Sequence, residues 1–402
     1  MSTYAHYRAA LQGEPLPCAF VDLDAVDRNL ETLLAPVRAA GKTLRMASKS
    51  LRCVALMEHL FAQGGDTLKG VMCFSATEAA WLAQRGFHDL FVAYPTGQLC
   101  DADLLAQANL GPATVGIVVD STGQLDLLDR AARAVDSVIP VVVEVDTSYR
   151  PLGPWVHVGA RRSPLRTPAG VLSLCEHIAG RPGLRLQGVM GYESHIAGVQ
   201  DASPFVSGPM NAATRWMKRK AHPHVVEVRA RIAAGLRARG IAYDLFNGGG
   251  TGSVSLTAAE PHLTEVTAGS GFVDSHLFDY FQGLDLDPAI AFALQVVRRP
   301  DPRHVTCHGG GYVASGAAGP DKLPVPWLPQ GLALLGMEGA GEVQTPLRVP
   351  KGLALSLGDP VFFRHAKAGE LAEHFTEYLF LRGQGVLDRV ATYRGAGGCF
   401  LG

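Results

Sequence analysis

The sequence predicts an α/β protein, with a (β/α)8 TIM-type barrel followed by a C-terminal β-rich domain. Three observations support this prediction. Short apolar or β-branched runs alternate with stretches of helical spacing over about 250 residues, as barrels of this type require. After residue 275 the helical stretches nearly disappear, and strand-like runs follow one another between Gly, Pro and Asp. The length of 402 residues also fits two domains better than one.

Eight runs are predicted to form the barrel strands. They span 18–23, 43–47, 70–74, 90–94, 114–119, 138–145, 186–192 and 243–247. Helical spacing between them covers 26–40, 76–85, 123–134 and 223–239. Eight such units favour a closed barrel over the alternative, a doubly wound open sheet. We therefore expect the barrel within residues 18–275.

The remaining residues, 276–402, are expected to form the β-rich domain, and residues 1–17 could pack on either part. Strands are predicted at 293–297, 304–307, 341–349, 353–363 and 378–381. Alternation of such runs with turn-forming residues is typical of antiparallel sheets.

Composition excludes several classes of partner. The net charge of −1 gives no reason to expect nucleic acid or an anionic membrane surface. No apolar run reaches the roughly 18 residues of a membrane span, and the N-terminus lacks a signal-peptide pattern. The seven cysteines are scattered, odd in number and without a CxxC pair, so we expect free thiols in a cytoplasmic protein.

Lys49 is the first candidate for chemistry. It follows the run 43–47, and barrel enzymes carry their chemistry at the C-terminal ends of the strands. A lysine that is partly desolvated there has a lowered pKa and can form a Schiff base. The alternative is an ordinary surface lysine at a strand end.

A glycine-rich stretch follows the run 243–247. Gly248-Gly249-Gly250-Thr251-Gly252-Ser253 can turn sharply and direct several N–H groups at one anion. It is neither a Walker A loop nor a dinucleotide fingerprint. Barrels commonly hold a phosphate after strands seven and eight, so we expect a phosphate cup here. The run Ala268-Gly269-Ser270-Gly271 could complete it, and a glycine turn without a ligand is the alternative.

Two further strand ends carry polar side chains. Arg150 follows the run 138–145 and could pair with a phenolate oxygen or a carboxylate. Tyr192 ends the run 186–192 and could hydrogen-bond a ring oxygen or act as an acid or base. A structural polar role is the alternative for both.

The C-terminal part offers His365 and Lys367, which share one face if their segment is extended. Cys307 and His308 are adjacent and would point to opposite faces of a strand, which argues against a shared metal. A lone histidine is more often structural than catalytic.

Several of these features follow one another in a recognisable order. They are Lys49 after a strand, Glu144-Val145-Asp146 with Arg150 nearby, Gly191-Tyr192, the stretch 248–253, the stretch 265–270, and His365. This order resembles the D-threonine aldolase / D-serine dehydratase family of fold-type III pyridoxal-5′-phosphate (PLP) enzymes, relatives of alanine racemase. The resemblance extends from about residue 18 to residue 394, and its most specific part is 248–253 followed by 265–270. The lysine context differs, because Ala47-Ser48-Lys49 stands where the family commonly has His-Ala-Lys.

The resemblance implies a set of roles. Lys49 would carry PLP as a Schiff base, and Tyr192 would lie beside the cofactor ring. Arg150 would approach the phenolate oxygen, one residue off the family spacing. His365 stands where the family has a histidine that binds a divalent metal and can deprotonate the substrate hydroxyl. The residues implied for the phosphate are Gly249, Gly250, Thr251, Gly269 and Ser270.

One departure from the family concerns the metal. The family's second ligand, an Asp or Cys two residues after the histidine, is Lys367 here, and an ammonium cannot bind a metal. We therefore expect no family metal, with Lys367 supplying a positive charge near the substrate's hydroxyl or carboxylate.

The predicted function is a PLP-dependent lyase that cleaves a D-configured β-hydroxy amino acid to glycine and an aldehyde. PLP stabilises a carbanion at Cα, and the protein selects which bond breaks. The alternatives are dehydration of D-serine or a related hydroxy amino acid, amino-acid racemisation, and a non-catalytic PLP-homeostasis protein. The last of these lacks a C-terminal β domain. By resemblance we also expect a homodimer, and the stretch 200–220 could form a lid or a surface loop.

Overall fold

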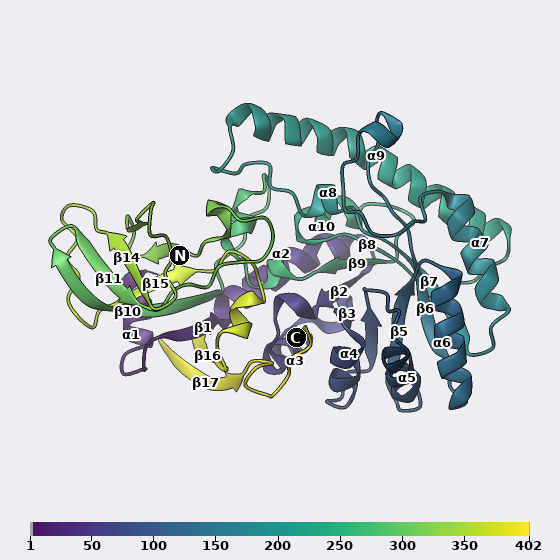
Figure 1. The fold of residues 1–402 in the computed structure, drawn as a ribbon, viewed down its shortest axis with the longest axis horizontal. Coiled ribbons are helices and arrows are strands. Elements are labelled where there is room, and N and C mark those ends of the chain that lie inside the picture. The colour runs from purple at the N-terminus through teal and green to yellow at the C-terminus, as the bar shows by residue number, and fades with distance from the viewer. Residues whose placement is uncertain (1–2, 402) are drawn as a thin grey trace.

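The computed structural model describes residues 3–401 and contains two β structures that lie side by side (Figure 1). Strands β2–β9 form a closed parallel barrel, and a nine-stranded sheet stands next to it. A helix-covered barrel with a separate β-rich sheet confirms the predicted fold class. Within residues 3–401, no helix is both long and apolar enough to cross a membrane.

The barrel strands follow one another in chain order. They are β2 (Thr43–Ala47), β3 (Leu68–Cys73), β4 (Asp89–Val92), β5 (Thr114–Val119), β6 (Ile139–Glu144), β7 (Leu184–Gly191), β8 (Leu245–Gly248) and β9 (Glu265–Ala268). Strand β2 closes the barrel by pairing with β9. Because all strands run in the same direction, their carboxyl ends meet at one rim, where side chains from different strands can form a site.

Helices connect the strands and cover the outside of the barrel (Figure 1). They are α2 (Leu23–Ala39), α3 (Val54–Gly64), α4 (Ala76–Ala83), α5 (Leu99–Ala108), α6 (Thr122–Ala134), α7 (Pro168–Ala179), α8 (Ser194–Ala197), α9 (Gly208–Ala238) and α10 (Val254–Ala258). Their apolar faces pack on the strands, as helical spacing in the sequence indicates.

Helix α9 begins fifteen residues before the predicted start at Pro223. Proline is favoured in the first turn of a helix, so Pro223 resembled a start signal, but it lies inside α9. Most of the stretch 200–220 is therefore helix. The remainder of it, residues 200–207, is the connection that leads into α9.

One predicted barrel strand was wrong. Strand β1 (Cys18–Asp22) lies in the neighbouring sheet, antiparallel to β10 and parallel to β16. The eighth barrel strand is β9, which was not predicted as a strand. It has only four residues and begins with a charged side chain, Glu265, which is buried because it pairs with Arg45 inside the barrel.

The second sheet contains β1 and the strands that follow the barrel. These are β10 (Ile290–Asp301), β11 (His304–His308), β12 (Val325–Leu328), β13 (Ala333–Leu334), β14 (Gln344–Arg348), β15 (Pro360–Arg364), β16 (Glu377–Arg382) and β17 (Gly385–Ala391). The predicted strand 353–363 corresponds to β15, which begins only at Pro360. Helix α1 (Tyr4–Ala10) packs on this sheet, where Tyr7 contacts Phe20 and Phe362.

A polar layer inside the barrel joins strands that are distant in the chain. Arg45 on β2 is 2% exposed, and its Nε donates to Glu265 Oε1 on β9 at 2.7 Å. Its two terminal nitrogens donate to Asp89 on β4 at 2.9 and 3.0 Å. Asn247 on β8 donates to the same Glu265 oxygen at 2.7 Å. Four strands are thus connected by one polar network, which is buried at Arg45 and Glu265 and half-exposed at Asp89.

Removing Arg45 should destabilise the whole fold. The substitution Arg45→Met leaves Glu265 buried without its cation, so we expect the free energy of unfolding to fall by about 3 kcal/mol, as for other broken buried pairs. Urea denaturation followed by circular dichroism measures the change. Arg38→Met is the matched control, because Arg38 and Glu31 form an exposed pair worth less than about 1 kcal/mol. Equal stability losses in the two variants would contradict the structural role of Arg45.

Candidate active site

A cavity opens at the rim formed by the carboxyl ends of the barrel strands. It is lined by residues that follow six of these strands, which is the location expected for barrel chemistry. Apolar side chains such as Met72, Met190 and Phe278 form part of the wall. Titratable side chains in the lining come from Lys49, Tyr94, Arg162 and Tyr192.

Lys49 lies in a 3-10 turn, Ser48–Ser50, directly after β2. Two neighbours fix the backbone of this turn. Arg52 Nε donates to the Lys49 carbonyl oxygen at 3.2 Å. Gly369 of the C-terminal part packs on the same carbonyl, and a Cβ at Gly369 would lie only 1.9 Å from that oxygen. The side chain of Lys49 lines the cavity, as the sequence predicted.

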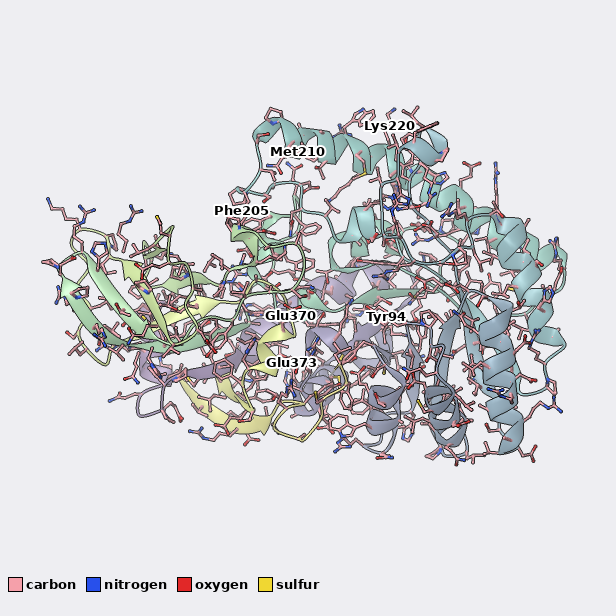
Figure 2. All side chains as sticks on the ribbon, viewed as in Figure 1. Tyr94, Phe205, Met210, Lys220, Glu370 and Glu373 are labelled. Atoms are coloured by element: carbon pink, nitrogen blue, oxygen red, sulfur yellow. The ribbon has the colours of Figure 1, made fainter. Side chains whose placement is uncertain are left out.

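Tyr94 lies two residues beyond β4 and contacts Lys49 directly. Lys49 Nζ donates to Tyr94 Oη at 3.1 Å. Burial raises the pKa of Tyr94, but the charge and hydrogen bond of Lys49, together with Arg162, outweigh burial and leave this pKa below its usual value. The two side chains are therefore hydrogen-bonded neighbours in the cavity. Figure 2 labels Tyr94, with Met210 and Lys220 of α9 above it in that view.

Arg162 lies between two aromatic rings. Its guanidinium carbon is 5.2 Å from the ring centre of Tyr192 and 5.8 Å from that of Tyr94. The loop that carries it is fixed on both sides, because Ser163 Oγ donates to the Glu144 carbonyl at 2.7 Å and the Ala160 N–H donates to Ser194 Oγ at 2.8 Å. Arg162 is thus a positioned cation at the cavity wall.

Tyr192 follows β7 and lines the cavity, as predicted. Burial raises its pKa to about 12, so its hydroxyl keeps its proton at neutral pH. A Cβ at Gly250 would lie 3.1 Å from Tyr192 Cε2, and one at Gly198 would lie 3.2 Å from Tyr192 Oη. The tyrosine ring therefore packs directly against glycine backbone on two sides.

The predicted phosphate cup lies on one side of the cavity, and its two halves follow adjacent strands, β8 and β9. The lining residues are Gly249, Gly250, Thr251, Gly269 and Ser270. Gly269 packs closely on the turn after β2, since a Cβ at this position would lie 2.6 Å from Ser50 Oγ. Thr251 Oγ1 accepts the Gly271 N–H at 3.0 Å, which joins the two halves. With β9 counted, the cup follows the seventh and eighth barrel strands, where barrels commonly hold phosphate.

Glu193 accepts hydrogen bonds from the part of the cup that follows β8, on the side away from the cavity. It is 1% exposed and accepts hydrogen bonds from the Gly249 N–H, Ser253 Oγ and Thr257 Oγ1 at 3.1, 2.7 and 2.7 Å. Arg229, which is fully buried, pairs with Glu193 and with Glu260. Burial alone would raise the pKa of Glu193, but the Arg229 charge and these hydrogen bonds lower it to about 2. The Gly249 N–H is thus used inside the protein rather than directed into the cup.

The structure does not bring Arg150 into the cavity lining. Its guanidinium is held by Ser148 Oγ and Asp146 Oδ2, both at 3.1 Å. Arg162, twelve residues further on, is the arginine in the lining. The loop after β6 is long and folds back on β7, so position in the chain does not indicate which of its arginines reaches the rim.

His365 and Lys367 also lie outside the lining of this cavity. His365 is 3% exposed, neither ring nitrogen has a hydrogen-bond partner, and burial beside Arg364 and His276 lowers its pKa to about 3. Lys367 Nζ donates to Ser315 Oγ at 2.7 Å and lies 3.3 Å from Glu370. Among residues 3–401, no three His, Cys, Asp or Glu side chains gather as a metal site would require.

Two of the four titratable residues in the lining were missed by the sequence analysis, Tyr94 and Arg162. Tyr94 could have been predicted from its position, because it ends the predicted strand 90–94, just as Lys49 follows the predicted strand 43–47. Arg162 lies in a loop between β6 and α7, where neither spacing nor periodicity distinguishes it from Arg161 or Arg166.

A parallel barrel with a lysine and glycine-rich turns at one rim is typical of a class of cofactor-binding enzyme folds, and comparison with known proteins identifies the family within it. A family model described as "Alanine racemase, N-terminal domain" matches residues 21–273. The chain belongs to this family.

The chain is also similar to individual proteins, in sequence to two aldolases and in fold to a third. The chain is similar to 3-hydroxy-D-aspartate aldolase of Paracoccus denitrificans, 28% identical over 260 residues, which cover 64% of this chain and 60% of that relative. It is also similar to D-threonine aldolase of Arthrobacter sp, 27% identical over 330 residues, which cover 78% of each chain. The crystal structure of D-threonine aldolase from Filomicrobium marinum has the same fold, with a TM-score of 0.80, 22% identity and 95% coverage of both chains.

The depressed pKa of Glu193 predicts a pH-dependent contribution to stability. The carboxylate has a pKa of about 2 in the fold and about 4.5 when unfolded, so its contribution is present above pH 4.5 and is lost as the pH falls toward 2. Glu193→Gln should lower the free energy of unfolding by about 3 kcal/mol at neutral pH. The difference from wild type should shrink in acid.

Urea unfolding of both proteins from pH 7 down to pH 3 measures this effect. Glu176→Gln is the control, because Glu176 lies on the surface in an exposed pair with Arg239. A stability difference between Glu193→Gln and wild type that stays constant across this range would show that the carboxylate charge is not the cause.

Proposed function

We propose that this protein is a PLP-dependent lyase that cleaves a D-configured β-hydroxy amino acid to glycine and an aldehyde. The observation that carries this proposal is that Lys49 and the phosphate cup face one cavity from adjacent strands. A lysine beside an anion cup is what an enzyme needs to hold a phosphorylated aldehyde, one end through a covalent bond and the other through hydrogen bonds.

The residues of the cavity fit PLP. A Cβ at Gly249, Gly250 or Gly269 would lie within 3 Å of neighbouring protein atoms, so glycine backbone forms this wall of the cavity, and Thr251 and Ser270 also line it. Lys49 would hold the aldehyde carbon of the cofactor. Arg162, rather than Arg150, is the cation available for its phenolate oxygen. Tyr192 would lie against the ring, with its hydroxyl protonated.

Bound PLP would accept the electron pair released at the Cα carbon of the amino acid. The protein has three tasks beside it. Arg162 and Lys49 provide the positive charges for an anionic substrate and cofactor. The apolar wall of Met72, Met190 and Phe278 reduces the water around the reacting carbon. A base must also remove the proton of the β-hydroxyl for the Cα–Cβ bond to break.

The names of the relatives support cleavage over dehydration. The Paracoccus and Arthrobacter proteins are both aldolases, one of 3-hydroxy-D-aspartate and one of D-threonine. Both act on D-configured β-hydroxy amino acids, which is the substrate class proposed here. Dehydration of the same class remains the alternative, because it starts from the same bound substrate and breaks the Cα–H and Cβ–O bonds in place of Cα–Cβ.

The residues at His365 do not fit the divalent metal that the resemblance implies. The second ligand position is Lys367, whose ammonium is held by Ser315 and Glu370, and both ring nitrogens of His365 are buried. We therefore assign no step of the proposed reaction to a metal at this position.

PLP should bind to the purified protein and become attached at Lys49. We expect a visible absorbance band after PLP is added, and borohydride should fix the cofactor to the peptide that contains Lys49. Lys49→Ala should lose both signals. Lys69→Ala is the control, since Lys69 lies on β3 near the opposite end of the barrel. Loss of the band in both variants, or in neither, would remove the basis for the Lys49 assignment.

The loaded protein should convert D-threonine or D-phenylserine to glycine and an aldehyde. Product analysis by mass spectrometry distinguishes the two lyase reactions. Glycine plus aldehyde identifies cleavage, whereas a keto acid plus ammonia identifies dehydration. A loaded protein that produced only the opposite enantiomer of its substrate would instead be a racemase.

Chelation should leave the activity intact. Because Lys367 occupies the second ligand position, we expect the loaded enzyme to keep its rate after incubation with EDTA and dialysis. The rate with and without added Mn2+ or Zn2+ is the measurement. Complete loss on chelation with rescue by either ion would refute this expectation and require ligands elsewhere in the protein.

A further inference from the structure

Cleavage of a β-hydroxy amino acid needs a base close to the substrate hydroxyl, and the cavity offers few candidates. Its titratable lining residues, within the described part of the chain, are Lys49, Tyr94, Arg162 and Tyr192. No carboxylate or imidazole belongs to that lining. The histidine expected to serve, His365, is buried outside it.

Three of the four can be set aside by their chemistry. Arginine keeps its proton in proteins. Burial raises the pKa of Tyr192 to about 12, so its phenol does not ionise near neutral pH. In the proposed function, Lys49 carries the cofactor and, once the substrate amine has displaced it, is needed to give a proton to Cα. Tyr94 remains.

We propose that Tyr94 is a catalytic acid–base residue of this site, whose Oη takes the proton of the substrate's β-hydroxyl and exchanges it with Lys49 Nζ. This inference rests on the proposed lyase function and deepens it. Tyr94 Oη lies 3.1 Å from Lys49 Nζ, which is hydrogen-bond distance for direct proton transfer.

The surroundings of Tyr94 favour its ionised form. Lys49 approaches its hydroxyl from the end of β2, and Arg162 lies 5.8 Å from its ring centre. Burial and Glu144 act in the opposite direction, and Tyr192 is the other phenol nearby. The balance places the pKa of Tyr94 below its usual value. Because two cations stabilise its phenolate, Tyr94 can act as a base at a pH where a tyrosine in water is still protonated.

The proposed step balances in protons and electrons. The phenolate of Tyr94 takes the hydroxyl proton, the O–H electron pair becomes the second bond of the aldehyde carbonyl, and the Cα–Cβ pair leaves with the glycine portion toward PLP. Lys49, which is free while the substrate amine is held by the cofactor, gives its own proton to Cα. The proton then passes from Tyr94 Oη to the Lys49 amine, which restores the phenolate and the ammonium, so that no proton is gained or lost overall.

The variant Tyr94→Phe tests the role, because it removes only the hydroxyl. We expect Tyr94→Phe to load PLP as wild type does, which shows an intact cavity. Its kcat for aldehyde release should fall at least about 100-fold, the usual effect of losing a general base, with KM changed only a few-fold. The rise of kcat with pH that follows ionisation of Tyr94 should disappear. Tyr149→Phe is the matched control, since Tyr149 lies outside the cavity lining.

A second readout does not depend on turnover. Phenolate absorbance of the full chain is recorded as the pH is raised, in wild type, Tyr94→Phe and Lys49→Met. Wild type should contain one tyrosine that ionises earlier than the rest, and Tyr94→Phe should lack it. In Lys49→Met the same transition should move to higher pH, because the neighbouring cation is gone.

The outcomes separate this inference from the proposed function. A PLP-loaded Tyr94→Phe protein that keeps its kcat and pH profile would overturn the role of Tyr94 and leave the lyase assignment standing. If the phenolate transition occurs at the same pH in wild type and in Lys49→Met, the proton exchange between Tyr94 and Lys49 is overturned. Failure of wild type to bind PLP or to cleave any β-hydroxy amino acid would instead remove the lyase function itself.

Discussion

The pairing of β2 with β9, with the buried ion pair of Arg45 and Glu265 between them, brings the parts of the candidate site together. This pairing closes the barrel, because β2 and β9 are the first and last of its strands. Closure brings the turn after β2, with Lys49, next to the turn after β9, with Ser270. Ser50 Oγ and Ser270 Oγ lie 3.4 Å apart, so the lysine and the phosphate cup share a wall. Residues 220 positions apart in the chain thus become neighbours because the strands before them are paired.

The charges at the rim suit an anionic ligand. The cavity lining contains two cations and no carboxylate within the described residues. Glu193, which holds the cup, is turned away from the cavity and neutralised by Arg229. The carboxylate that fixes the glycine backbone is therefore paired with Arg229 outside the cavity lining, so it adds no unpaired negative charge to the cavity wall.

Much of the site could be predicted from the sequence because its residues directly follow strands. Lys49, Tyr192 and the glycine-rich stretch were found in this way. Arg162 could not be found, because a long loop places it and loop geometry leaves no periodic signal. Arg150 was chosen in its place from family spacing.

The strand assignment failed for a related reason. β1 has the same apolar pattern as a barrel strand because it is buried in the neighbouring sheet, whereas β9 is short and begins with a charge. The pattern of a strand shows that it is buried but not which sheet contains it.

The position of β1 has a consequence for the synthesis of the protein. Its two partners, β10 and β16, lie about 270 and 360 residues further along the chain, so at ribosomal rates β1 must wait on the order of tens of seconds for both. During this time a strand that is apolar on both sides has no permanent neighbour. Gly369, which packs on the Lys49 carbonyl, also emerges late. The barrel can assemble on the ribosome, but the turn that carries Lys49 reaches its final environment only near the end of translation.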